Sequence, residues 1–196
     1  MAATEAVFPQ IETARLRLRE LVADDVDTLF AIHGDAETMR WFGADPLRSR
    51  AQAAQLVELF ASWRTQTNPG VRWGIERKAD GALIGTCGLF KWNAAWRSCS
   101  LGYELARDMH GAGYMAEALR GALDWGFEHM ALNRVEAMIH PNNAASARVV
   151  TKLGFLQEGR LREAGFWNGR HHDLDFFALL RSDWVARSGG ALEQGS

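Results

Sequence analysis

The pattern of apolar and polar residues divides the first 105 residues into two helices and four strands. Leucine alternates with arginine over residues 15–19, which is the spacing of a half-buried strand, and Asp24-Asp25 offers a start for a helix. A second helix is predicted from residue 48 to about residue 67. Three further strands are predicted at residues 71–77, 82–90 and 99–105, with Asp80-Gly81 marking a hairpin between the first two.

The next segment alternates between helices and strands. An apolar stripe at helical spacing predicts a helix over residues 115–130, and residues 134–139 form a predicted strand. Residues 143–153 predict another helix, with Asn143 as its N-cap and Gly154 in a left-handed conformation at its end.

The chain closes with a predicted hairpin. One strand runs from residue 155 to about residue 164, and the second arm returns over residues 171–180. We expect one domain over residues 1–187 and a disordered tail over residues 188–196. Hairpins followed by alternating strands and helices imply an α/β fold whose mixed sheet has a parallel pair near its middle. Ligands bind beyond the carboxyl ends of such strands.

The segment between residues 107 and 117 has the pattern of an anion cradle. Gly111-Ala112-Gly113 lets the backbone approach a ligand, and the helix start that follows offers unpaired N–H groups to a phosphate. With 19 glycines in the chain, one such triplet is weak evidence, and a plain connecting turn is the alternative. A second strand-to-helix entry at residues 142–146 strengthens the case, because two entries side by side describe a crevice. The sequence therefore predicts a phosphorylated cofactor.

Composition narrows the class of protein. The 196 residues are 47% hydrophobic and carry a net charge of −2, which predicts a globular protein without a nucleic-acid partner. The arginines of residues 15–19 are expected on the wet face of their strand. No apolar run reaches the roughly 18 residues that span a bilayer, and the N-terminus lacks a secretory pattern, so we expect a cytoplasmic location and no membrane partner. Cys87 and Cys99 are expected to be buried and not nucleophilic, and no metal site is predicted.

Several short motifs occur in a characteristic order over nearly the whole chain. They are Glu12-Thr13-Ala14-Arg15-Leu16-Arg17-Leu18-Arg19, Gly102-Tyr103-Glu104-Leu105, Gly111-Ala112-Gly113-Tyr114 with Glu117-Ala118, Asn143-Ala144-Ala145-Ser146, Lys152-Leu153-Gly154-Phe155, Asn168-Gly169-Arg170, Asp173 and Leu180-Arg181-Ser182-Asp183-Trp184. In this order and spacing the chain resembles the GNAT family of acyl-CoA-dependent N-acetyltransferases. More narrowly, it resembles the ribosomal-protein N-terminal acetyltransferase (RimJ/RimL-type) branch.

This resemblance implies the GNAT fold, with a mixed, mostly antiparallel seven-stranded sheet and about four helices. Residues 100–105 and 134–139 would be the parallel strands that splay apart, leaving backbone groups that can bond the pantetheine arm of acetyl-CoA. The residues expected to bind this cosubstrate are Leu105, Arg107, His110, Gly111, Ala112, Gly113, Tyr114, Met115, Ala116, Asn143 and Ser146.

The implied reaction is direct attack of an amine on the thioester through a tetrahedral intermediate. Ser146 is expected to donate a hydrogen bond to the leaving sulfur, and the alternative is a serine that bonds its own helix. The general base is open among Glu104, which we rank first, His110 and Glu163, with a path through water available to each. Where some of the branch carry a catalytic glutamate, this chain has Gly165, and Glu163 is expected to share its strand face. The alternative for each glutamate is an ordinary solvated strand residue, and the alternative for His110 is a residue that only begins the cradle.

The acceptor is expected to be a protein α-amino group, and the alternative is a small amine such as an amino acid, a polyamine or an aminoglycoside. Four tryptophans in predicted loops, Trp41, Trp92, Trp96 and Trp167, mark the expected acceptor site. A catalytically silent acyl-CoA-binding protein is a further alternative. A nicotinamide-dependent oxidoreductase is disfavoured, because Ala116 stands where the third glycine of its motif belongs. An exposed last hairpin would suit a homodimer.

Overall fold

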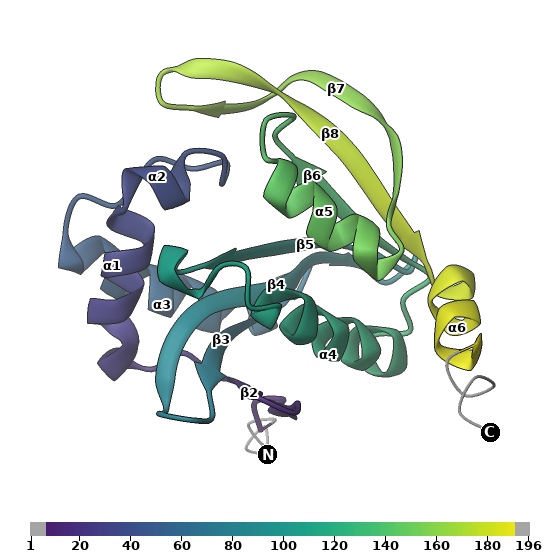
Figure 1. Ribbon diagram of the computed structural model, residues 1–196, viewed down its shortest axis with the longest axis horizontal. Coiled ribbons are helices and arrows are strands. Elements are labelled where there is room, and N and C mark those ends of the chain that lie inside the picture. Colours follow the sequence, from purple (N-terminus) through teal and green to yellow (C-terminus); the bar gives the residue numbers. More distant parts are fainter. Residues whose placement is uncertain (1–6, 191–196) are drawn as a thin grey trace.

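The computed structural model describes residues 7–190, with side chains up to residue 187, and contains an eight-stranded sheet (Figure 1). The strands lie in the order β1-β2-β3-β4-β5-β6-β8-β7, and every neighbouring pair is antiparallel except β5 and β6. Their bounds are β1 (Ile11–Glu12), β2 (Leu16–Arg19), β3 (Val71–Arg77), β4 (Ala82–Asn93), β5 (Ser98–Leu105), β6 (Arg134–Ile139), β7 (Leu156–Trp167) and β8 (Arg170–Leu180).

Six α-helices accompany the sheet in the described part of the chain. They are α1 (Val26–Gly34), α2 (Ala36–Met39), α3 (Arg50–Ser62), α4 (Tyr114–His129), α5 (Ala144–Leu153) and α6 (Arg181–Gly190). The expected α/β architecture with a mixed sheet is confirmed. Asn143 caps α5 as expected, and Gly154 ends it with a φ of 100°.

The element counts differ from expectation by one strand and two helices. Strand β1 has two residues and α2 has four, which is too short to show a period in the sequence. Helix α6 is held by a tertiary contact, because Trp184 is buried against Phe127 and donates its indole N–H to Asp124 Oδ1 at 2.8 Å. This helix includes residues 188–190 of the expected tail, and residues 191–196 lie outside the described residues.

The parallel strands β5 and β6 pair only at their beginnings. The register joins Ser98 to Arg134 and ends where Ser100 faces Glu136. Beyond that point β5 stays paired with β4 up to Leu105, and β6 stays paired with β8 up to Ile139. The facing edges of the two strands therefore separate, as expected, and their backbone groups have no strand partner there.

Helices pack on both faces of the sheet. On β3, Trp73 and Ile75 belong to the large core that also contains Leu119 and Leu123 of α4. The intervening Gly74 lies against Leu21, which packs in a smaller cluster with Phe60 of α3. Since alternate strand residues point to opposite faces, α4 covers one face, and α1 and α3 cover the other.

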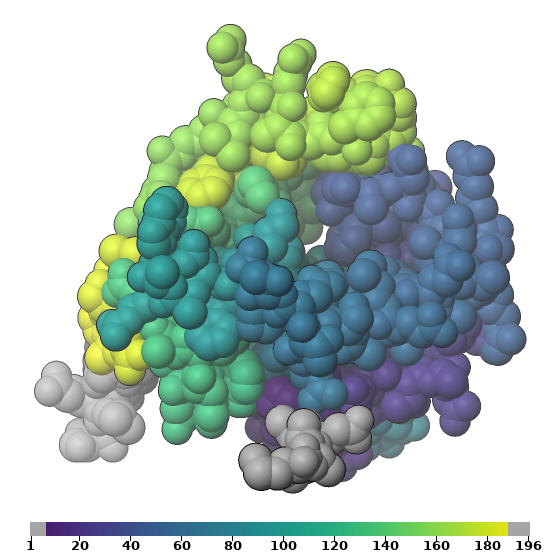
Figure 2. Space-filling model, turned by 180° about the vertical axis from the view of Figure 1, so that it is seen from behind, coloured from purple at the N-terminus to yellow at the C-terminus, as the bar shows by residue number. Residues whose placement is uncertain are grey.

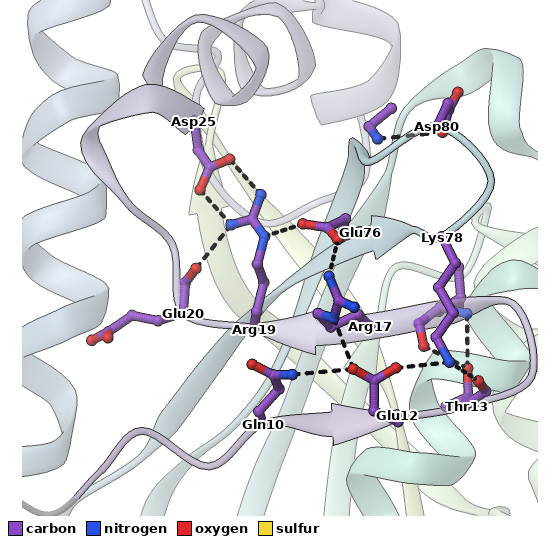
Figure 3. A network of polar contacts seen from close by, with 12 residues as sticks. Gln10, Glu12, Thr13, Arg17, Arg19, Glu20, Asp25, Glu76, Lys78 and Asp80 are labelled. Carbon is purple, nitrogen blue, oxygen red and sulfur yellow. Dashed lines mark hydrogen bonds and ion pairs between the residues drawn. The ribbon is translucent and has the colours of Figure 1, made fainter.

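Half-buried ion pairs link the first three strands (Figure 3). Arg19 contacts Asp25 at 2.7 Å and Glu76 at 2.5 Å, which links β2 to β3 and to the start of α1. Arg17 contacts Glu76 at 2.8 Å and Glu12 at 2.7 Å. The arginines of β2 thus alternate with buried leucines as expected, but they form ion pairs instead of a merely hydrated face.

Among the described residues, no helix is both long and apolar enough to cross a membrane.

Candidate active site

A cleft of about 1210 Å³ opens where β5 and β6 separate. Figure 2 shows the molecular surface hollowed beneath the β7–β8 hairpin, beside the blue segment that contains α3. Ten of the eleven expected cofactor-binding residues line this cleft, and Ala112 is the exception. Of the three expected catalytic residues, Ser146, which is among those ten, and Glu104 line the cleft, whereas Glu163 does not.

The cradle has the backbone geometry that the glycine pattern predicts. Gly111 and Gly113 both have a φ of 80°, a left-handed conformation that side chains rarely adopt, and α4 begins directly afterwards at Tyr114. Within the part of the chain that the structure describes, the amides of residues 111–116 have no backbone partner, and the ladder of α4 begins with Glu117 N–H donating to Gly113. These free donors at a helix N-terminus suit a diphosphate.

Arg15 supports the cradle from behind, a role that sequence reasoning missed. Its guanidinium donates to the Ala112 carbonyl at 3.0 Å and to Glu117 Oε2 at 2.7 Å, and it stacks 4.5 Å from the centre of the Tyr114 ring. Because arginine and leucine alternate regularly over residues 15–19, nothing in the local pattern distinguishes Arg15 from Arg17. Only the packing of β2 against the start of α4 separates their roles.

His110 and Arg107 lie between β5 and the cradle. His110 Nε2 contacts the Leu105 carbonyl at 3.0 Å, which ties the cradle to the end of β5. Since a carbonyl only accepts, this nitrogen carries the proton. Arg107 is exposed and lies 3.9 Å from Asp35. Neither side chain is buried, and the Arg107 guanidinium remains available to an anionic ligand.

The start of α5 faces β5 across the cleft. Asn143 Oδ1 accepts from Ser146 N–H at 3.1 Å, and the Ser146 hydroxyl lies 2.6 Å from the hydroxyl of Tyr103. Burial raises the pKa of Tyr103, so its phenol stays protonated and can donate to Ser146 Oγ. The phenol also reaches the Ser146 carbonyl at 3.2 Å, and when it donates to Oγ the serine proton is free for a ligand. Tyr103 was not singled out from the sequence, although it is one of only two tyrosines in the chain.

Glu104 is fully enclosed in a polar cluster at the floor of the cleft. Its carboxylate pairs with Arg72, accepts from the Thr86 hydroxyl, and contacts His33 Nε2 at 3.0 Å. Burial alone would raise the pKa of Glu104, but Arg72, His33 and Thr86 outweigh it and hold this pKa well below its usual range. Glu104 is therefore neither the solvated residue of the alternative reading nor a strong proton acceptor.

Glu163 lies outside the cleft, contrary to expectation. The register of β7 and β8 shifts between Leu161 and Gly165, and Glu163 has a φ of 52°. This bulge breaks the alternation that would have placed Glu163 on the face of Gly165. At Gly165 itself, an added Cβ would stand 2.4 Å from the ring of Trp167. The tryptophan therefore occupies the space that a side chain at residue 165 would need.

The four expected tryptophans separate into two pairs. Trp41 and Trp167 line the cleft. The Trp41 ring stacks on the His140 ring with their centres 4.1 Å apart, and Trp167 donates its indole N–H to the Arg40 carbonyl at 3.2 Å. Trp92 and Trp96 belong to the β4–β5 hairpin and do not reach the cleft, and Trp96 is 80% exposed. Their loop joins the end of β4 to the start of β5, so it lies at the amino end of β5, whereas the cleft opens toward the carboxyl end of that strand.

Residues 15–156 match the family model described as an acetyltransferase (GNAT) domain. The chain belongs to the GNAT acetyltransferase family. It is 33% identical over 175 residues to the uncharacterized N-acetyltransferase YoaA of Bacillus subtilis, covering 89% of this chain and 98% of that protein. It is also 35% identical over 128 residues to the "Putative ribosomal N-acetyltransferase YdaF" of the same species, covering 64% of this chain and 69% of that one, which supports the RimJ/RimL-type branch.

Solved structures agree on the fold. The spermidine N-acetyltransferase from Vibrio cholerae, in complex with CoA and spermine, has a TM-score of 0.76 at 24% identity and covers 88% of this chain and 99% of that one. The acetyltransferase described here therefore has the GNAT fold and uses acetyl-CoA as cosubstrate, which supplies the acetyl group as a thioester. The free amides of the cradle and the open edges of β5 and β6 fit this cosubstrate.

Proposed function

We propose that this acetyltransferase acts on the α-amino group of a protein N-terminus. The observation that carries the proposal is the state of the four carboxylates that line the cleft, because three of them already pair with an arginine and the fourth accepts a backbone hydrogen bond. Glu37 pairs with Arg40 at 3.7 Å and Glu136 with Arg134 at 2.7 Å. Asp45 accepts from the backbone N–H of Asn168 at 2.6 Å, and Glu104 pairs with Arg72.

A polyamine carries several positive charges and would need several unpaired carboxylates to compensate them. A peptide N-terminus carries a single charge and is followed by a neutral backbone. Aromatic side chains at the acceptor end, among them Trp41, Phe42 and Trp167, offer flat apolar surface to the first residues of such a chain. The name of the relative YdaF agrees with a protein acceptor.

For the cosubstrate, we propose that the amides of residues 111–116 hold the diphosphate, with Arg107 and His110 beside it. Asn143 would contact the pantetheine arm, and the backbone near Leu105 would hold the thioester carbonyl. The Tyr103–Ser146 hydroxyl pair would donate to the departing sulfur, because the buried phenol can orient the serine proton toward the cleft.

We also propose a cytoplasmic location and a homodimer. Cys87 and Cys99 are both free and buried, which supports a reducing, cytoplasmic environment. Exposed apolar side chains on β7, such as Leu156 and Phe166, support a homodimer through the last hairpin.

Thiol release from acetyl-CoA distinguishes the acceptors. We expect peptides with free N-termini to release CoA at least about tenfold faster than spermidine at equal concentration, since about 1.4 kcal/mol of lost charge compensation corresponds to that factor. The same peptides with acetylated N-termini are the matched control and should give only background release. Faster turnover of spermidine than of every free peptide would instead identify a small-amine acetyltransferase.

A further inference from the structure

Four polar side chains from distant parts of the sequence meet at the floor of the cleft. His33 comes from α1, Arg72 from β3, Thr86 from β4 and Glu104 from β5, and each is at most 6% exposed. Burying such groups is costly unless they are paired, and here they are paired with one another. Arg72 Nε donates to Thr86 Oγ1 at 2.7 Å, and the same hydroxyl donates to Glu104. The carboxylate is therefore fixed by three donors from three different elements.

This arrangement determines the tautomer of His33. An ionised carboxylate only accepts hydrogen bonds, so the nitrogen that contacts Glu104 Oε1, Nε2 of His33, must carry its proton. In neutral imidazole the other nitrogen, Nδ1, then holds a free lone pair. Among the described residues Nδ1 has no hydrogen-bond partner, and His33 is one of the residues that line the cleft.

We infer that His33 accepts the proton that the acceptor ammonium must lose before it attacks, and that Glu104 is the positioning residue that holds the imidazole for this purpose. The proton moves from the ammonium nitrogen to His33 Nδ1, giving an imidazolium whose charge faces the Glu104 carboxylate. The amine lone pair forms the new C–N bond, the C–S bond breaks, and the second amine proton ends on the sulfur as the thiol. His33 returns its proton to water.

The surroundings favour His33 over the other groups in the cleft. Glu104 is the carboxylate in contact with the imidazole, Arg72 lies behind that carboxylate, and the edge-on ring of Phe42 stands 5.3 Å away. Other ionisable groups around α1 are paired with one another, namely Asp25 with Arg19, Asp27 with Arg50, Glu37 with Arg40, and Arg107 with Asp35. His110 binds a neutral carbonyl and lacks a carboxylate that could stabilise a positive charge.

The test measures kcat/KM from pH 6 to pH 10 with the amine that is acetylated fastest in a panel of free peptides, spermidine and lysine. The choice of amine makes the result independent of the acceptor class proposed above. For His33→Gln we expect a loss of about 100-fold near pH 7, the usual scale of general base catalysis, with acetyl-CoA affinity unchanged within twofold. The loss should shrink to less than tenfold at pH 10, where the amine is increasingly deprotonated in solution.

A second variant keeps the test independent of one substitution. In His33→Ala, free imidazole in the assay should restore part of the lost rate, and it should not affect wild type. Glu104→Gln should cost about as much as His33→Gln near pH 7, because an amide can donate to Nε2 and move the proton to Nδ1. The double variant should be no slower than either single variant within about threefold.

His129→Gln is the matched control, because this exposed histidine lies on α4 outside the cleft. It should retain the wild-type rate at every pH. A His33→Gln rate equal to wild type would overturn the proposal. So would a deficit of the same size from pH 6 to pH 10 without rescue of His33→Ala by imidazole, since that pattern indicates a purely structural histidine.

Discussion

The two ends of the cleft are built from different parts of the chain. At the cradle, main-chain N–H groups of residues 111–116 are left free by two left-handed glycines and a helix start. At the floor and the acceptor end, side chains such as Arg72 and Glu104 are buried and paired with one another. A site made from the backbone tolerates many side chains but few changes of conformation. A site made from paired, buried side chains tolerates few changes of chemistry.

The largest expected effect tests the buried end. Glu104→Gln should lower the free energy of unfolding by about 3–5 kcal/mol, because Arg72 is left buried without its carboxylate. Urea denaturation at pH 7 measures the change. Glu163→Gln, which alters an exposed glutamate outside the cleft, should leave the unfolding midpoint unchanged.

The stability difference between wild type and Glu104→Gln should depend on pH. Burial raises the pKa of Glu104, but Arg72 and His33 lower it more, so the folded state favours the ionised carboxylate. The stabilisation is therefore complete above the unfolded pKa of about 4.3 and is lost as the pH falls below it. The difference between wild type and Glu104→Gln should narrow in that acid range. A difference that stays constant down to pH 3 would contradict the ion-pair account.

An intermediate effect tests the backbone end. Gly113→Val should weaken acetyl-CoA binding about 10- to 150-fold, which corresponds to one lost charged hydrogen bond of about 1.5–3 kcal/mol, because valine resists a φ of 80°. Isothermal titration calorimetry measures the affinity. Gly81→Val places the same strain at a hairpin turn with a φ of 71° and should leave binding intact. Equal losses in both variants would show that strain alone, not the cradle, is responsible.

The smallest effect lies at the junction of the two ends. Ser146→Ala and Tyr103→Phe should each lower kcat about tenfold while acetyl-CoA affinity changes little, because each removes a hydroxyl of one hydrogen-bonded pair. Their effects should not multiply in the double variant. Steady-state kinetics checks this, and an unchanged kcat for Ser146→Ala would remove the pair from the chemistry.

Sequence reasoning found the cradle more readily than the floor for a physical reason. Gly111 and Gly113 stand within three residues of the helix they introduce, so short-range pattern is enough to locate their amides. His33 and Glu104 are 71 residues apart, and neither carries a local signal that it is buried or paired. For Glu163 a local pattern existed but was misleading, because a bulge in β7 places this residue on a different face from the one that strict alternation predicts. Trp96 lies outside the cleft because its loop is at the amino end of β5, whereas the cleft opens toward the carboxyl end of that strand.

By itself, the sequence determined the order of most strands and helices, the capped start of α5 and the cradle at the start of α4. Hydrophobic periodicity, helix capping and glycine conformation depend on neighbours within a few residues, so a short segment of sequence is enough to predict them. Tertiary structure alone decided that Arg15 supports the cradle, that Tyr103 meets Ser146, and that Trp184 anchors a last helix. It also decided the buried pairing around Glu104. These contacts depend on how strands pair and helices pack, and they join residues that no short segment of the chain contains.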